Sequence, residues 1–510
     1  MMIKKFILYI NISLLTLMSE LVCGETSAPE SQGKYSPTWE SIDQRPTPSW
    51  FKDAKFGIFI HWGVYSVPSF APVGRYAEWY WNDLDRGRNP TQNSTYKHIR
   101  SAVRTWEFHQ KNYGADYPYQ DFAPQFRAEL WDPEKWADLF ARSGAKYVVL
   151  TSKHHDGFCL WPSDLPNEAY GRPWNSTQVG PKRDIIDELS KAVRAKGLRM
   201  GLYFSLYEWF NPIWLNDKPR YVKEYMHPQF KDVVTRYKPS TIFSDGEWDI
   251  PSDEWKSTEL LAWLFNQSPV KDEVAIDDRW GKETRHKHGG YYTTEYGSGM
   301  SDDSHAWEES RGMAFSYGFN RMETVKDYRS SKELLLMLVD TVSRGGNLLL
   351  DVGPNADGTM PGIMEQRLLD IGDWLTSSGE AIYETRPWTR SRQWSAGEIP
   401  VDKPGNYKTG YDINKLVVKT SPTSAVIELF FTRKGDSLYV IVPSWPGKNF
   451  TVKNLKLPKK AKASYLPQGR DVPWKQEGEN VVIDCSSLPT ESAFAFTVPH
   501  VFKLSGAIPK

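Results

Sequence analysis

The chain of 510 residues is too long for one ordinary domain, although a barrel of about 250 residues or more with a smaller appended domain would fit. Its 63 basic and 63 acidic residues give a formal net charge of zero, which removes the attraction that nucleic acid or an anionic membrane surface would use. We therefore expect two domains and an uncharged substrate, with neither nucleic acid nor a membrane as a partner.

Residues 1–24 have the order of a secretory signal peptide. A basic pair precedes an apolar run at residues 6–18, and small residues follow near Gly24. The run is too short to remain as a membrane span. Lipidation of Cys23 is the alternative, but Glu20 occupies a place where a lipoprotein signal needs an apolar residue. We therefore expect cleavage near Gly24 and a secreted or periplasmic protein.

Residues 33–387 alternate helical and strand patterns at the spacing of β/α units. Residues 133–142 carry an apolar helical stripe, a glycine ends this helix, and residues 147–150 then have the pattern of a buried strand. The same order of helix, glycine and strand recurs at 185–205 and 334–352. This pattern predicts a parallel sheet with helices outside, arranged as a (β/α)8-like, TIM-type barrel.

Two segments depart from this pattern. Residues 81–119 are polar and poorly periodic, so we expect a long loop over one end of the barrel. From residue 388 to residue 510 the sequence changes to short alternating runs, such as 424–431 and 437–442, broken by Pro, Gly and Lys. Such runs are typical of antiparallel strands, and we predict a C-terminal β-sandwich domain.

Ionisable and aromatic residues follow the ends of several predicted strands. In a β/α barrel the loops after the strands converge on one face, where the chemistry takes place. The groups are His61-Trp62-Gly63, Lys153-His154-His155-Asp156-Gly157, Asp245-Gly246-Glu247-Trp248, Asp278-Arg279-Trp280 and Glu295-Tyr296-Gly297. Packing alone does not explain so many ionisable residues at strand ends, so we predict an active site at this face.

Several of these residues also have a structural interpretation. A histidine at a strand end, such as His61, can be a hydrogen-bonded structural residue. The adjacent His154 and His155 suggest a metal, but neighbouring strand residues point to opposite faces and cannot readily share one ion, so we expect no metal. Asp245 follows an apolar strand, where an unpaired carboxylate costs several kcal/mol to bury. It therefore either forms a structural ion pair with Arg279 or lies in a cleft.

The motifs between residues 50 and 386 resemble, in order and spacing, those of glycoside hydrolase family 29, the α-L-fucosidases. The matching segments are 56–63, Glu78-Trp79-Tyr80, 153–158, 180–184 and 278–281. The resemblance implies a barrel followed by a β-sandwich, which agrees with the periodicity. It also implies a retaining exo-glycosidase that releases terminal α-L-fucosyl residues from oligosaccharides or glycoconjugates and needs no cofactor.

Retention requires two carboxyl groups about 5 to 5.5 Å apart, one acting as nucleophile and the other as general acid/base. The resemblance assigns the nucleophile to Asp245 and the acid/base to Glu295, with Asp278 as the alternative acid. Phe243 stands where the family often has tryptophan. The positions that resemble the family's fucose pocket are His61, Glu78, Trp79, His154, His155, Tyr203, Arg279 and Tyr317.

Two other functions stay open. A retaining glycosidase of the same architecture could prefer another sugar, such as galactose. A secreted carbohydrate-binding protein without catalysis would instead use the C-terminal sandwich, but an inactive relative is expected to lose a carboxylate. Asp245 and Glu295 are both present, which favours an active enzyme.

Overall fold

The computed structural model describes residues 33–90, 96–297, 299–400, 412–489 and 498–508. The signal peptide predicted at residues 1–24 lies outside this part of the chain. Within the described ranges, no helix combines the length and the apolar character that crossing a membrane requires.

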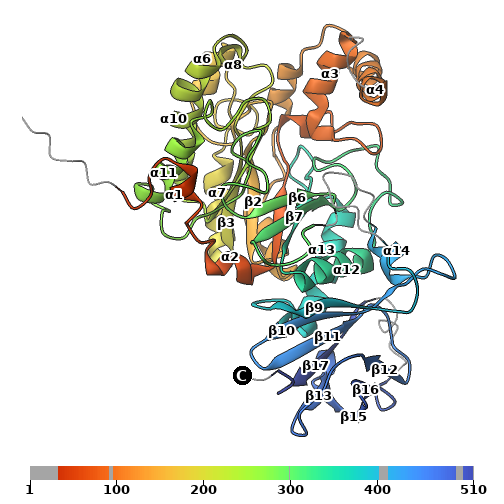
Figure 1. Ribbon diagram of the computed structural model, residues 1–510. Coiled ribbons are helices and arrows are strands. Elements are labelled where there is room, and N and C mark those ends of the chain that lie inside the picture. Colours follow the sequence, from red (N-terminus) through yellow and green to blue (C-terminus); the bar gives the residue numbers. More distant parts are fainter. Residues whose placement is uncertain (1–32, 91–95, 298, 401–411, 490–497, 509–510) are drawn as a thin grey trace, which may run out of the picture.

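An eight-stranded parallel sheet forms the centre of the N-terminal part of the chain (Figure 1). Its strands, in sheet order, are β5 (Ala275–Ile276), β4 (Thr241–Asp245), β3 (Arg199–Ser205), β2 (Tyr147–Lys153), β1 (Phe56–Ile60), β8 (Asn347–Val352), β7 (Trp307–Gly312) and β6 (Tyr292–Glu295). Backbone hydrogen bonds of 2.9 Å from Gly290 to Asp277 and from Tyr291 to Ile276 link the two edges. The predicted (β/α)8-like fold is confirmed.

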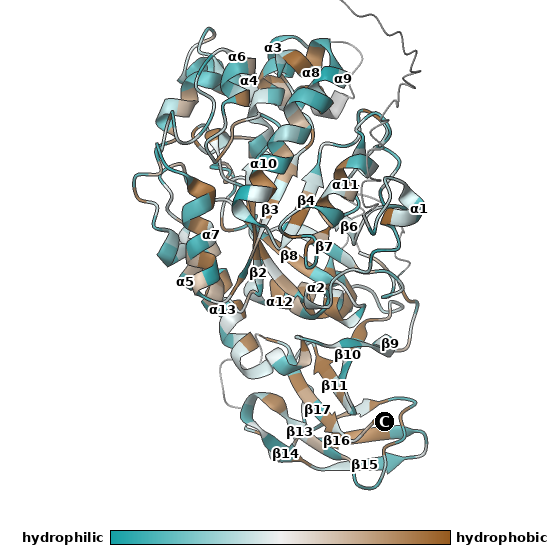
Figure 2. Cartoon of the chain, turned by 90° about the vertical axis from the view of Figure 1, so that its left-hand side faces the viewer, coloured by the Kyte–Doolittle hydropathy of each residue, from teal (hydrophilic) through white to brown (hydrophobic). Residues whose placement is uncertain are grey.

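The helix and strand order predicted for three β/α units is confirmed at α5 (Pro133–Arg142), α7 (Ile185–Ala195) and α12 (Ser331–Ser343). Each helix begins with a side chain that accepts a hydrogen bond from a backbone amide of its first turn, at Asp132, Asp184 and Ser330 respectively. In Figure 2 the central strands of the barrel, such as β2 and β3, are mainly hydrophobic, whereas the helices around them carry hydrophilic residues. The apolar faces of these helices therefore pack onto the sheet.

The prediction of a long loop at residues 81–119 is wrong. The structure has two helices there, α3 (Tyr80–Arg88) and α4 (Tyr96–Asn112), which pack against each other. The inward face of α4 includes Thr105 and His109, both fully buried, and His109 hydrogen bonds the Tyr80 hydroxyl at 2.8 Å. A helix whose buried face contains polar residues gives a weak signal in a search for apolar periodicity.

Further helices complete the structure around the barrel (Figure 1). They are α1 (Trp39–Ile42), α2 (Ser49–Ala54), α6 (Leu165–Tyr170), α8 (Pro212–Asn216), α9 (Lys218–Arg220), α10 (His227–Tyr237), α11 (Ser257–Asn266) and α13 (Gly362–Ser378), and a short helix of the C-terminal part, α14 (Ile413–Val417), follows β9 in sequence. Helices α3, α4, α6 and α8 lie at the end of the barrel remote from the C-terminal part, whereas α12 and α13 lie next to it.

The C-terminal part is an antiparallel β-sandwich, as predicted. One sheet has the order β14 (Arg470–Val472), β13 (Lys462–Tyr465), β17 (His500–Ser505), β11 (Ser437–Val442), β10 (Ile427–Lys434) and β9 (Arg386–Trp394). The other has the order β12 (Asn449–Val452), β16 (Asn480–Asp484) and β15 (Trp474–Glu477). Because β9 pairs with β10 and begins before residue 388, we propose a domain boundary immediately before β9.

Candidate active site

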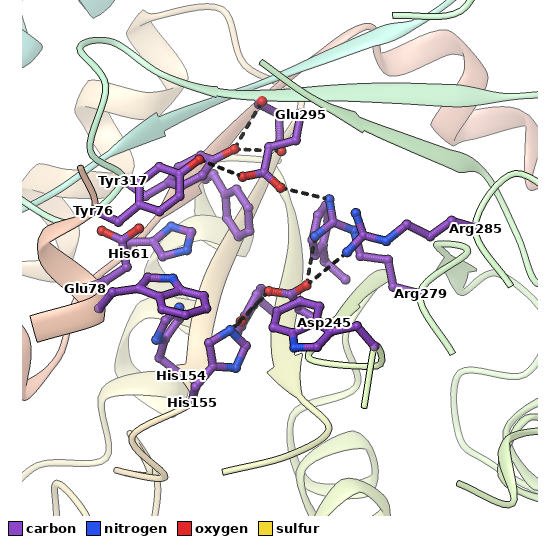
Figure 3. Close-up of a pocket in the computed structure, with 16 residues that line it drawn as sticks. His61, Tyr76, Glu78, His154, His155, Asp245, Arg279, Arg285, Glu295 and Tyr317 are labelled. Atoms are coloured by element: carbon purple, nitrogen blue, oxygen red, sulfur yellow. Dashed lines mark hydrogen bonds and ion pairs between the residues drawn. The ribbon is translucent and has the colours of Figure 1, made fainter. Parts of the chain in front are cut away.

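A cavity of about 300 Å³ opens among the carboxyl ends of the strands (Figure 3). All ten residues that the sequence assigned to catalysis or substrate binding line this cavity. The full lining consists of Phe59, His61, Tyr76, Glu78, Trp79, His154, His155, Tyr203, Phe243, Asp245, Trp248, Arg279, Arg285, Glu295, Ser310 and Tyr317. The cavity therefore combines convergent polar groups with aromatic walls, as small-ligand sites usually do.

Strand β4 delivers Asp245 into the cavity. Successive strand residues alternate between faces, so Phe243 and Asp245 lie on the same side of β4. Phe243 packs in the aromatic interior of the barrel, and Asp245 follows it at the open end. Gly246 then has a φ of +76°, and a Cβ there would lie 2.4 Å from the Tyr207 ring. A glycine is thus required where the chain turns away behind Asp245.

Positive charge and hydrogen bonds surround the Asp245 carboxylate. Arg279 Nη1 donates to Oδ1 at 2.8 Å, and the Tyr203 hydroxyl donates to Oδ2 at 2.9 Å. His155 Nε2 lies 3.4 Å from Oδ2, and Arg285 Nη2 lies 3.7 Å from Oδ1. Burial alone would raise the pKa of Asp245, but Arg279, His155 and Arg285 hold it well below its usual range. Asp245 is therefore an ionised carboxylate at neutral pH.

Arg279 joins Asp245 to Glu295, the last residue of β6. Its Nη2 lies 3.4 Å from Glu295 Oε2, so one guanidinium contacts both carboxylates (Figure 3). The Tyr76 hydroxyl donates to the other oxygen of Glu295 at 3.2 Å. The Arg279 guanidinium in turn stacks on the Phe243 ring at 4.6 Å. The ion pair considered for Asp245 is present, and it lies within the cavity.

Asp278 does not line the cavity. Its side chain is fully buried, and Oδ1 accepts hydrogen bonds from the Thr293 amide at 3.1 Å and the Thr293 hydroxyl at 2.7 Å. Its Oδ2 accepts the His286 amide at 2.7 Å. These contacts hold the loop after β5 against β6. Because Arg279 directly follows Asp278 in the chain, they also help to position Arg279.

His61 and Glu78 are both buried, and each is in an uncharged protonation state that can donate and accept hydrogen bonds. His61 Nδ1 lies 2.6 Å from Asp351 Oδ1, and burial lowers the pKa of His61 to about 3, so the imidazole is neutral. Glu78 Oε2 accepts hydrogen bonds from the Gly318 amide at 2.8 Å and the Ser316 hydroxyl at 3.2 Å. Burial raises the pKa of Glu78 to about 8, so its side chain carries a proton at neutral pH.

His154 and His155 lie side by side, with ring centroids 4.2 Å apart. The expectation that they point to opposite faces is wrong, because β2 ends at Lys153 and strand alternation does not continue into the loop. His155 Nδ1 hydrogen bonds the Ser205 hydroxyl at 2.6 Å, and its carbonyl accepts the Trp209 amide at 2.8 Å. Among the described residues, no group of three His, Cys, Asp or Glu side chains is placed to hold a metal ion.

Sequence reasoning missed Tyr76, Arg285 and Asp351 at this site. Asp351 interrupts the apolar run that follows Asn347 in β8, and that interruption was a usable signal. Tyr76 and Arg285 lie outside the β-strands. Their approach to Glu295 and Asp245 depends on the tertiary fold, so no local pattern could have indicated it.

A barrel with paired carboxylates at its strand ends, around a cavity lined by neutral hydrogen-bonding groups and aromatic rings, defines a glycoside hydrolase. The alpha-L-fucosidase family matches residues 22–380 of the chain, which therefore belongs to that family.

Individual relatives agree with this assignment. The chain is 47% identical to an alpha-L-fucosidase of Dictyostelium discoideum over 364 residues, which cover 70% of this chain and 75% of that protein. It is 40% identical to the tissue alpha-L-fucosidase of Rattus norvegicus over 485 residues, which cover 92% and 93% respectively. The crystal structure of Thermotoga maritima alpha-fucosidase in complex with fucose has 34% identity and a TM-score of 0.71, covering 92% of this chain and 100% of that one.

Proposed function

We propose that this chain is a retaining α-L-fucosidase that hydrolyses terminal α-L-fucosyl residues of oligosaccharides or glycoconjugates. The observation that carries this proposal is the contact of one guanidinium, Arg279, with both Asp245 and Glu295. Retaining glycosidases keep their two carboxyl groups about 5 to 5.5 Å apart, and a shared guanidinium supports a separation of this kind. The complex of the Thermotoga maritima relative with a mechanism-based inhibitor, at 33% identity, also supports it.

In the first step, Asp245 attacks the anomeric carbon of the fucosyl group while the bond to the leaving oxygen breaks. Glu295, initially protonated, gives its proton to that oxygen, so the leaving group departs as an alcohol. The product is a fucosyl ester on Asp245. The ionised state that Arg279 and Arg285 maintain on Asp245 suits a nucleophile, because attack requires the carboxylate.

In the second step, Glu295 takes a proton from water, and the resulting hydroxide attacks the anomeric carbon. The ester bond breaks, Asp245 becomes a carboxylate again, and fucose leaves with its original configuration. Arg279 contacts both carboxylates, so it stays paired when the negative charge moves from Asp245 to Glu295. Preorganised charge of this kind stabilises a transition state without reorganisation.

The rest of the cavity supports recognition of a neutral sugar. His61, His154, His155 and Glu78 offer donors and acceptors for the ring hydroxyls. Trp79 and Tyr317 add aromatic surface for stacking, and Phe59 adds apolar surface on which the C6 methyl group of fucose can rest. An apolar wall discriminates against the hydroxymethyl group of galactose by roughly 1 to 3 kcal/mol.

We further propose that residues 1–24 are removed as a signal peptide and that the mature enzyme acts outside the cytoplasm. The sequence pattern of this segment supports the proposal. N-terminal sequencing of the active protein should find a start near Glu25. An intact Met1, or a lipid on Cys23, would contradict it.

The proposed activity is tested by comparing nitrophenyl α-L-fucoside with the matching galactoside and following the first product by NMR. We expect hydrolysis of the fucoside, with α-L-fucose as the first anomer. Preferential hydrolysis of the galactoside would contradict the sugar assignment, and initial release of the β-anomer would contradict retention.

A further inference from the structure

Glu247 is a third carboxylate next to the catalytic pair, two residues after Asp245 in sequence. It is 2% exposed, and its Oε1 accepts a hydrogen bond from Arg285 Nε at 2.5 Å. Its Oε2 is buried and has no hydrogen-bond partner among the described residues. Arg285 also lies 3.7 Å from Asp245 Oδ1, so this guanidinium is shared between Glu247 and the proposed nucleophile.

Two guanidinium groups and three carboxylates thus form one chain of contacts. Arg279 lies between Glu295 and Asp245, and Arg285 lies between Asp245 and Glu247. The Arg279 side chain is 3% exposed, so water screens its charge little, whereas the Arg285 side chain is 34% exposed and its charge is partly screened. Asp245 is the member that contacts both guanidinium groups.

The charges of this group balance in both halves of a double displacement. The proposed mechanism requires a protonated Glu295 when substrate binds, and the two charges of Asp245 and Glu247 then balance those of the two arginines. In the fucosyl ester Asp245 is neutral, Glu295 has given up its proton, and Glu247 and Glu295 again balance the two arginines. Each arginine keeps an ionised partner throughout only if Glu247 is present.

We propose that Glu247 is a positioning residue that holds Arg285 beside the nucleophile and supplies the fixed counter-charge that Arg285 needs when Asp245 is esterified. This inference rests on the proposed retaining mechanism. Without Glu247, Arg285 would have no ionised partner once Asp245 is esterified, and its charge would lie next to a sugar that develops positive charge as the ester forms and breaks. The role is electrostatic, since Glu247 does not line the cavity.

The charged groups that face Glu247 are Arg285, Asp245 and Arg279. Burial and the charge of Asp245 raise the pKa of Glu247, whereas the two arginines lower it, and the net direction is upward. The pKa of Asp245 is depressed. We therefore expect Glu247 to take up a proton before Asp245 as the pH falls, which removes the counter-charge first.

A double-mutant cycle tests this inference. Glu247→Gln should lower kcat about 10- to 100-fold for aryl fucoside and oligosaccharide alike, because both steps are affected, and should flatten the acidic limb of the pH profile. Arg285→Gln should move that limb to higher pH, because two carboxylates then lack their shared cation. Glu247→Gln combined with Arg285→Gln restores the charge balance and should recover about tenfold over Glu247→Gln alone.

Glu254→Gln, at an exposed position nearby in sequence, should behave as wild type. Glu247→Asp keeps the negative charge, and it should retain more activity than Glu247→Gln when the two variants have equal thermal stability. This comparison separates the loss of charge from poor folding of Glu247→Gln. A double variant that is no more active than Glu247→Gln alone would overturn the inference. The anomer that wild type releases first distinguishes the two failures. If it is α-L-fucose, only the inference about Glu247 fails and the retaining mechanism stands; if it is the β-anomer, the retaining mechanism itself fails.

Discussion

Burial of Glu78 makes a quantitative prediction about stability. Its pKa rises from 4.5 to about 8 in the folded protein, so the folded chain holds a proton that the unfolded chain releases in this pH window. A difference of about 3.5 pH units at about 1.36 kcal/mol each corresponds to a free energy on the order of 5 kcal/mol. This contribution to stability is fully present below the pKa that Glu78 has in the unfolded chain, and it is lost as the pH rises towards 8.

Glu78→Gln should remove this pH dependence, because the amide resembles the protonated acid and cannot ionise. We expect the free energy of unfolding of wild type, measured by urea denaturation from pH 5 to pH 9, to fall relative to that of Glu78→Gln by a few kcal/mol. A buried acid whose pKa does not depend on Glu78, such as Glu308, is present in both proteins and cancels in the difference. The free energy of unfolding of Glu254→Gln should change with pH in parallel with that of wild type. Parallel curves for Glu78→Gln and wild type would refute the reasoning.

The remaining predictions concern the acid and the absence of a cofactor. Glu295→Ala should impair hydrolysis of oligosaccharides far more than that of a fucoside with a good leaving group, measured as kcat/KM, because only a poor leaving group needs protonation. The same pattern for Asp278→Ala would instead assign the acid to Asp278. Activity should survive exhaustive treatment with EDTA, since two carboxylates suffice for hydrolysis. A large loss that zinc reverses would show that the histidines bind a metal.

The helices and strands were predictable where their ends carry local signals. The helix at Pro133–Arg142 has an aspartate cap before it and a glycine shortly after it, and both are visible in the sequence. The helix at Tyr96–Asn112 was missed because Thr105 and His109 occupy its buried face. Tertiary contacts, such as the hydrogen bond between His109 and Tyr80, satisfy these polar groups, and no local rule anticipates them.

The site was predictable as a set of residues but not as a network. Polar groups at strand ends, together with the family resemblance, assigned ten of the sixteen residues that line the cavity. The sharing of Arg279 between Asp245 and Glu295 requires three separate strand ends to meet. The approach of Arg285 to Glu247 depends on the fold of a loop that precedes β6. Electrostatic roles of this kind become visible only in three dimensions.

The most direct test of the account is to trap the enzyme with a 2-fluoro fucosyl donor and locate the adduct by peptide mass spectrometry. The fluorine slows breakdown of the ester, so wild type should accumulate one fucosyl group on the peptide that contains Asp245. Asp245→Gly should form no adduct and should lose on the order of a thousandfold in kcat, with partial recovery in azide as β-fucosyl azide. An adduct on another carboxylate, or none in a protein that hydrolyses fucosides, would contradict the assignment of Asp245 as the nucleophile.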